Sequence, residues 1–154
     1  MIELCPVTIQ NWEALIGLKV REDQRSFVAS NLYSIAQAQF GEEFEGHWDL
    51  HPFGIYVGEE PVGFVMYALK FDYPAYEAYV IRLMVDEKHQ GRGYGRAGME
   101  KVVEVFRADE RVHAVGISYE PDNEGARRLY ASLGFVETGR IVDEETEAVL
   151  KLKP

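Results

Sequence analysis

Cysteine is almost missing from this sequence. Cys5 is the single cysteine among 154 residues, so no disulfide can form within the chain. A lone thiol in an apolar pattern just ahead of a proline is typical of a buried packing residue, and we expect no catalytic role for it. Because no disulfide framework is present, we expect a reducing compartment, the cytoplasm.

Long apolar runs are missing as well. No stretch approaches the roughly 20 apolar residues that a membrane-spanning helix needs. The opening MIELCPVTIQNWE has neither the basic flank nor the long apolar segment of a signal peptide. We therefore predict no membrane partner, and the length fits a single domain, residues 1–154.

An excess of basic charge is the third absence. The net charge is −10, which argues against a nucleic-acid partner because such binding rests on neutralising phosphates. The acidic residues are concentrated near the N-terminus, where residues 1–60 carry ten acidic and three basic side chains. This asymmetry either serves solubility or attracts a cationic small molecule.

Hydrophobic patterns predict the order strand, two helices, three strands, helix, strand, helix and two strands. Asn11 is the expected cap of the first helix, and the stripe Met99, Val102, Val103 and Phe106 has the helical period. The helix over residues 31–40 is expected to carry a modest apolar stripe of Leu32, Ile35, Ala36 and Gln39. The order indicates a mixed α/β fold with an antiparallel first half. The expected strands cover residues 2–8, 53–57, 62–71, 76–85, 112–119 and a closing hairpin over 135–152, and the expected helices cover residues 11–19, 31–40, 96–107 and 123–133.

The most informative stretch is RLMVDEKHQGRGYGR, residues 82–96, in which glycines and arginines follow an apolar strand. Successive amides at a helix N-terminus bind phosphates, because the unpaired N–H groups and the helix dipole both favour negative charge. Glycine permits close backbone approach, and arginine adds charge-assisted contacts. We therefore predict an anion-binding loop, with an ordinary glycine-rich surface turn as the alternative.

Two other phosphate motifs match this loop only in part. Residues 93–98 have the spacing G-x-G-x-x-G, and Glu120 follows about 20 residues later, as in dinucleotide-binding folds. However, residues 86–90 separate the strand from these glycines, and the remaining chain is too short for a dinucleotide-binding domain. A phosphate loop of the nucleotide triphosphatase type is excluded because Met99 stands in the lysine position.

Two segments resemble a known family in the right order. LMVDEKHQGRGYGRAGM is similar to the coenzyme A signature Q/R-x-x-G-x-G/A of the GNAT family of N-acetyltransferases, with Gln90, Gly93 and Gly95 at the motif positions. NEGARRLYASLGF resembles the later segment of that family, which contains an asparagine, a small residue and a tyrosine. The segment QRSFVASNLYSIAQAQF looks like that of polyamine acetyltransferases within the family.

The resemblance implies a fold, a co-substrate and a set of contacts. The fold is a mostly antiparallel sheet of about six to seven strands flanked by about four helices. The co-substrate is acetyl-coenzyme A, with its pyrophosphate on the glycine loop and its pantetheine arm on the preceding strand. A homodimer is a further expectation from the family. The expected coenzyme contacts are Leu83, Met84, Val85, Gln90, Gly91, Arg92, Gly93, Tyr94, Gly95, Arg96, Asn123, Ala126 and Tyr130.

Tyr130 stands at the position of the family tyrosine near the sulfur, where a phenol fits a general acid; the alternative is a core aromatic on a helical stripe. The base that takes the amine's proton is less evident. Polyamine enzymes often carry an acid on the strand before the pantetheine site, where this chain has Ile81 and Arg82. Glu77 lies four residues before Ile81, on the same face of the expected strand, and is our candidate base. The alternative is that Glu77 is a solvated acid at the end of the strand.

HWDLH, residues 47–51, alternates histidine with acid, but two histidines and one acid in a loop fall short of a structural zinc set, so no metal site is predicted. We conclude from the sequence that the chain is an acetyl-coenzyme A-dependent N-acetyltransferase acting without a metal on a small cationic amine, with polyamines first. The alternatives are an aminoglycoside or other amine acceptor, or a non-catalytic acyl-coenzyme A binding module.

Overall fold

The computed structural model describes residues 1–154 and has a twisted eight-stranded sheet at its centre. The strands are β1 (Ile2–Pro6), β2 (Glu42–Glu43), β3 (His47–Val57), β4 (Glu60–Leu69), β5 (Ala78–Val85), β6 (Ala114–Tyr119), β7 (Val136–Val142) and β8 (Glu145–Lys151). The helices are α1 (Trp12–Ile16), α2 (Asn31–Ala38), α3 (Tyr94–Ala108) and α4 (Glu124–Ser132), with the 3₁₀ turns η1 (Glu22–Gln24) and η2 (Glu87–His89).

The strand order is β1-β3-β4-β5-β6-β8-β7, and β2 adds a short pairing with β3. Only β5 and β6 run parallel; every other pair is antiparallel. The crossover between them is α3, as a parallel connection requires. The predicted order of elements and the mixed α/β class are confirmed, with the two-residue β2 as an addition.

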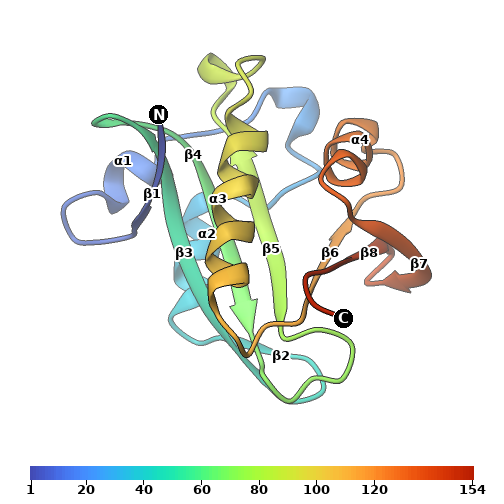
Figure 1. The fold of residues 1–154 in the computed structure, drawn as a ribbon. Coiled ribbons are helices and arrows are strands. Elements are labelled where there is room, and N and C mark those ends of the chain that lie inside the picture. Colours follow the sequence, from blue (N-terminus) through green and yellow to red (C-terminus); the bar gives the residue numbers. More distant parts are fainter.

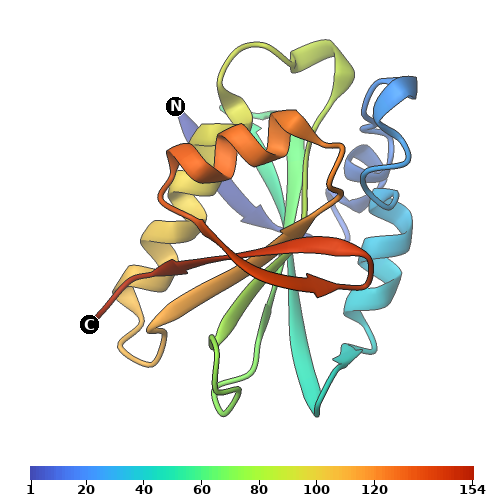
Figure 2. The same cartoon turned by 90° about the vertical axis from the view of Figure 1, so that its right-hand side faces the viewer.

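Helices cover both faces of the sheet: α3 and α4 lie on one side, and α1 and α2 lie on the other (Figures 1 and 2). Each face has its own hydrophobic cluster, and β4 contributes alternate residues to both. Val65 and Tyr67 belong to the α3 side, whereas Phe64 and Met66 belong to the α2 side. A strand buried on both faces therefore reads as one continuous apolar run.

The sheet forks between β5 and β6. Their ladder consists of three pairs and ends at Val80 opposite Ile117, after which the strands separate. On the other side of β5, the register with β4 shifts so that Ile81 has no partner. Such a bulge re-aims the following side chains. As a result, Ile81 packs on the α2 side and Arg82 donates from Nη2 to Oε1 of Gln37 in α2, over 3.2 Å.

The structure corrects four details predicted from the sequence. Residues 47–51 are the first part of β3 rather than a loop. The helix after the glycine loop begins at Tyr94 rather than at residue 96. In helix α2 the fully buried residues are Asn31 and Ser34, whereas Leu32 of the expected apolar stripe is exposed and Ile35 is only partly buried; the Asn31 amide donates to the carbonyl of Leu15 over 2.8 Å. Cys5 is half-buried rather than buried.

No helix is long and apolar enough to cross a membrane. No group of three or more His, Cys, Asp or Glu side chains is arranged to hold a metal ion. In the segment 47–51, His47 is engaged by Glu43 of β2 and lies 3.4 Å from Asp49, and all three side chains are exposed. These contacts describe a surface ion-pair cluster.

Candidate functional site

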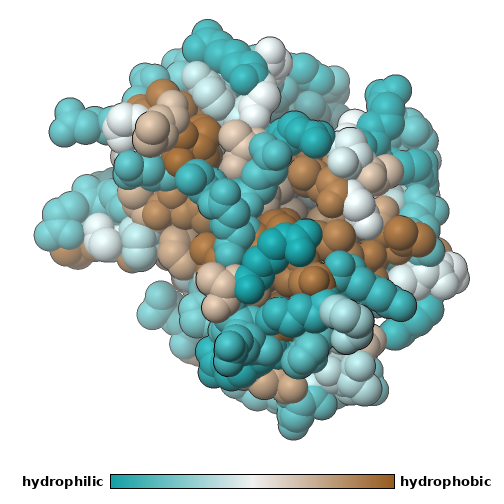
Figure 3. Space-filling model, viewed as in Figure 1, coloured by the Kyte–Doolittle hydropathy of each residue, from teal (hydrophilic) through white to brown (hydrophobic).

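A cleft of about 800 Å³ opens at the fork of the sheet. Its walls come from β5, β6, α4, the loop between β5 and α3, and the segment between α1 and α2. The volume falls within the range of small-molecule sites, roughly 300–1,000 Å³. In the space-filling view, apolar surface is visible between α3 and α4 and is framed by hydrophilic residues (Figure 3). The fork thus provides an apolar slot with polar edges.

The glycine loop forms one end of this cleft. Gly91 and Gly93 have φ angles of +80° and +82°, a left-handed conformation that favours glycine. Gly93 is also the N-cap of α3, so the free amides of the first turn and the positive end of the helix dipole lie at the loop. A Cβ added at either glycine would meet no atom within 4 Å, so the loop surface is open. This geometry fits an anion-binding cradle.

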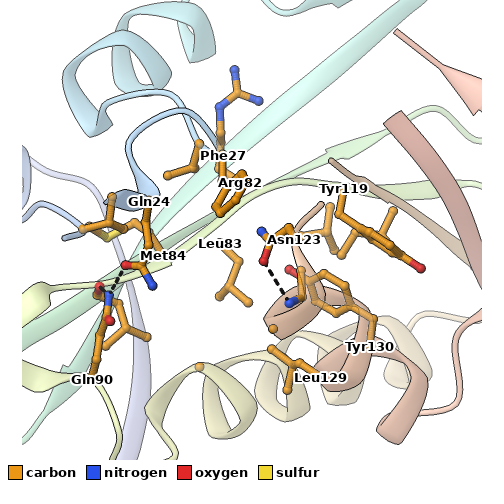
Figure 4. Close-up of a pocket in the computed structure, with 18 of the residues that line it drawn as sticks. Gln24, Phe27, Arg82, Leu83, Met84, Gln90, Tyr119, Asn123, Leu129 and Tyr130 are labelled. Atoms are coloured by element: carbon orange, nitrogen blue, oxygen red, sulfur yellow. Dashed lines mark hydrogen bonds between the residues drawn. The ribbon is translucent and has the colours of Figure 1, made fainter. Parts of the chain in front are cut away.

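The side chain of Gln90 lines the cleft and also tethers two segments of the chain. Its amide donates to the carbonyl of Val85 over 3.0 Å and to Oε1 of Gln24 over 2.9 Å (Figure 4). A second link lies beside it, where the backbone N–H of Lys19 donates to Asp86 over 3.0 Å. These contacts join the α1–α2 segment to the end of β5. The Gln90 amide is therefore committed to protein partners.

The loop arginines lie outside the cleft lining, whereas Tyr94 and Gly95 are part of it. Both Arg92 and Arg96 are exposed. Arg96 donates to the hydroxyl of Ser132 over 2.5 Å and so connects α3 with the end of α4. The loop's capacity to hold an anion consequently rests on backbone amides, with the arginine charges at the rim.

The free edge of β5 forms the floor of the cleft. Leu83, Met84 and Val85 all line it, and the Leu83 side chain points into it (Figure 4). Met84 turns instead toward the α2 side, where its sulfur lies 3.7 Å from the Asn31 amide. Since β6 no longer pairs with this part of β5, the backbone groups on that edge are available to a ligand.

Helix α4 contributes Asn123, Ala126 and Tyr130 to the opposite wall. Asn123 caps the helix by accepting the backbone N–H of Ala126 over 3.1 Å, as Figure 4 shows. The Tyr130 ring is buried between Tyr119 and Phe135, with centroids 5.8 Å away in each case. Its hydroxyl donates to no other residue. Burial, and then the charge of Glu145, raises the pKa of Tyr130, so the phenol stays protonated at neutral pH.

The structure does not bring Glu77 to the cleft. Glu77 precedes β5 at the end opposite the fork, and its carboxylate accepts the backbone N–H groups of His113 over 2.7 Å and Ala114 over 3.2 Å. The His113 ring lies 3.5 Å away. Strand parity relates Glu77 to Ile81 but does not show that Glu77 lies at the end away from the fork. Glu77 therefore anchors the start of β6 and is not available to a substrate in the cleft.

Sequence reasoning missed Glu145, the only carboxylate that lines the cleft. Glu145 is the first residue of β8 and accepts the hydroxyl of Ser118 in β6 over 2.7 Å. Ser118 in turn accepts the hydroxyl of Tyr79 in β5. In the sequence, Glu145 stands in the acidic run DEETE and resembles a solvated turn residue, so only the β6–β8 register reveals it.

These features define a class of α/β protein in which a forked sheet, a glycine loop and a helix-borne tyrosine share one cleft. The model of the acetyltransferase (GNAT) family matches residues 12–135. The chain belongs to the GNAT family and is an acetyltransferase, which confirms the resemblance seen in the sequence.

Individual relatives agree with this assignment. The chain is 27% identical to a spermine/spermidine N(1)-acetyltransferase of Bacillus subtilis (strain 168) over 147 residues, 91% of each chain. Its fold is similar to that of a spermidine N-acetyltransferase from Vibrio cholerae in complex with CoA and spermine, with a TM-score of 0.74, 16% identity and coverage of 98% and 95%. An aminoglycoside acetyltransferase in complex with coenzyme A gives a TM-score of 0.76 at 16% identity, again covering 98% and 95%.

Proposed function

We propose that this acetyltransferase moves the acetyl group of acetyl-coenzyme A to a primary amine of a small cationic acceptor, with polyamines such as spermine and spermidine first. The observation that carries the proposal is the single continuous cleft. It runs from the glycine loop, past the free edge of β5 and Tyr130, to the α1–α2 segment on the other face of the sheet. One ligand can therefore enter from the α3 and α4 side and the other from the α2 side.

The coenzyme fits the α3 and α4 side. Amides of residues 90–96 would cradle its pyrophosphate at the N-terminus of α3. Main-chain groups of Leu83 and Val85 would pair with the amides of the pantetheine arm, much as a neighbouring strand would. This places the thioester at the fork, where a backbone N–H of β5 can donate to the oxygen that becomes negative during attack.

Tyr130 supplies the proton that the leaving sulfur needs. The amine nitrogen attacks the thioester carbon directly, the C–S bond breaks, and the departing thiolate takes the phenol proton. The raised pKa of Tyr130 ensures that the phenol carries its proton at neutral pH, and it also makes the transfer depend on close positioning. The hydroxyl's lack of a protein partner leaves it free for the sulfur.

The polyamine choice rests on sequence similarity rather than on the fold. The Bacillus relative acts on spermine and spermidine by its name and is 27% identical across nearly the whole chain. Polyamine and aminoglycoside enzymes match the fold about equally, at TM-scores of 0.74 and 0.76, so the fold does not separate them. The net charge of −10 also favours a cationic acceptor.

The test is a panel of acceptors: spermine, spermidine, putrescine, aminoglycosides and amino acids, each with acetyl-coenzyme A and a thiol-release readout. We expect the highest kcat/KM with spermine or spermidine. Highest turnover with an aminoglycoside would replace the acceptor and leave acetyl transfer in place. No turnover with any amine would contradict the proposal.

A further inference from the structure

The cleft is nearly free of negative charge. Among the side chains that line it, Glu145 is the only carboxylate, Arg25 and Arg82 are the cations, and His89 is the one histidine. A cationic amine entering from the α2 side therefore has a single anionic partner within the cleft. An ammonium group in a partly desolvated site needs such a partner.

Glu145 is held in place by elements on both arms of the fork. It begins β8 just after the turn residues Asp143 and Glu144, whose φ angles of 48° and 66° produce a tight reversal. Ser118 of β6 fixes its carboxylate at 2.7 Å, and Tyr79 of β5 fixes Ser118. Tyr79 and Ser118 adjoin the last β5–β6 pair, where the ladder ends. The carboxylate therefore has a defined position beside the point at which the strands part.

Charged groups on every neighbouring element act on Glu145. Burial raises its pKa most, Glu120 and Asp143 raise it further, and the Ser118 hydroxyl and the Arg82 charge lower it. Glu145 in turn raises the pKa of Tyr130, so the carboxylate and the phenol interact across the fork. A half-buried carboxylate with a raised pKa, beside a candidate general acid, is a recurrent arrangement in acid–base catalysis.

We propose that Glu145 binds the ammonium group of the acceptor and takes up the proton that the nitrogen loses during acetyl transfer. This inference rests on the proposed function and assigns the base that the sequence did not identify. Ser118 is a positioning residue for this carboxylate, since it holds Glu145 without reaching the reacting atoms.

In the proposed reaction the nitrogen loses two protons and the leaving sulfur gains one. The ammonium nitrogen passes one proton through Glu145 to solvent, and its lone pair then attacks the thioester carbon. Once the C–N bond has formed, the nitrogen gives a second proton to Glu145, which releases it to solvent, the C–S bond breaks, and the electron pair leaves on sulfur. Tyr130 protonates the thiolate and recovers its proton from solvent. Overall, one proton is released for each amide and thiol formed.

The decisive variant is Glu145→Gln, which preserves shape and removes the proton acceptor. With spermidine and saturating acetyl-coenzyme A, we expect kcat/KM to fall by about 100-fold or more. The activity of the wild-type enzyme should fall as the pH is lowered through the pKa of Glu145, which gives its pH–activity profile an acid limb. The variant should lack this acid limb. The matched control is Glu144→Gln, an exposed neighbour with the same change of charge, which should keep the wild-type profile. A wild-type rate and acid limb in Glu145→Gln would overturn the inference.

Ser118→Ala provides a second test, because a purely structural role for Ser118 would leave the pH–activity profile of the enzyme in place. Because the Ser118 hydroxyl lowers the pKa of Glu145, its removal should move the acid limb to higher pH. An unmoved limb would contradict the positioning role.

If the wild-type protein acetylates no amine, the proposed function fails, and Glu145 is then tested by binding instead of activity. Spermidine binding to the coenzyme A-bound protein is then measured by calorimetry. We expect affinity to fall about tenfold in Glu145→Gln, equal to about 1.4 kcal/mol, and to be unchanged in Glu144→Gln. Equal affinity in all three proteins would reject Glu145 as the ammonium partner.

Discussion

The two ends of the cleft, which we propose to hold the coenzyme and the acceptor, are encoded in different ways. The coenzyme end uses backbone conformation within short segments, as with the left-handed Gly91 and Gly93 ahead of α3. The acceptor end uses side chains from distant segments: Ser118 and Glu145 are 27 residues apart, and Arg82 and Gln37 are 45 apart. A local backbone device can be recognised as a motif, whereas a long-range contact depends on the complete fold. This difference allows one coenzyme site to be combined with many acceptor sites.

The largest effect should come from the residue at which the two ends meet. In Tyr130→Phe, we expect kcat to fall by about 100-fold while the Kd of coenzyme A stays near the wild-type value, because the ring that packs in the cleft is kept and only the proton donor is removed. Single-turnover kinetics and calorimetry would measure the two quantities.

Tyr119→Phe is the matched control for that change. The Tyr119 hydroxyl donates to Glu137 over 2.8 Å, so its removal should lower the free energy of unfolding by about 1 kcal/mol and leave kcat nearly unchanged. Equal losses of kcat in both variants would show that the effect is not specific to the Tyr130 hydroxyl and would contradict its role as proton donor.

A smaller effect, confined to the coenzyme end, is expected for Gly93→Ala. A left-handed conformation costs a non-glycine residue about 1–2 kcal/mol, and the loop relieves that strain by giving up the orientation of its amides. We expect the KM of acetyl-coenzyme A to rise about tenfold, with the KM of the amine unchanged. Steady-state kinetics with each substrate varied in turn would measure both.

Gly58→Ala tests whether this effect is local. Gly58 has a φ of +61° in the β3–β4 turn and no atom near its Cβ position, so the same strain arises outside the cleft. The variant should lose stability in thermal unfolding and keep both KM values. A rise in the acetyl-coenzyme A KM equal to that of Gly93→Ala would mean that general loosening, and not the loop, controls coenzyme affinity.

The predictability of the molecule follows the same division. The helical stripe of α3 and the β3–β4 hairpin were correctly predicted because they are repeating local patterns. The loop over residues 47–51 was wrong, although the alternation that buries Trp48 and Leu50 was visible in the sequence. Of the apolar stripe predicted for α2, Ile35 packs against the core, but the fully buried positions belong to Asn31 and Ser34, and the Asn31 amide finds its acceptor sixteen residues away at Leu15.

In the candidate site, too, local patterns were predictable and long-range contacts were not. The pattern of residues 90–95 and the spacing from Asn123 to Tyr130 placed the coenzyme-side candidates, and most of them line one cleft. Glu77, the base predicted from the sequence, lies outside the cleft, because strand parity identifies the face of a strand but not which end reaches the fork. Glu145 lay beyond sequence reasoning, since its position depends on the antiparallel register of β8 against β6, where Thr146 pairs with Tyr119.

The smallest effect should come from the contact that joins the two ends. Gln24→Ala removes the acceptor of the 2.9 Å hydrogen bond from Gln90 but leaves the bond from Gln90 to Val85 intact. The α1–α2 segment then loses one of its ties to β5, at a cost of about 1 kcal/mol or less. We expect the KM of the amine to rise a few-fold, with the KM of acetyl-coenzyme A unchanged, because the coenzyme loop keeps its own anchor. If both KM values rose together, the Gln24–Gln90 contact would support both ends of the cleft. The two ends would then not be independent of each other.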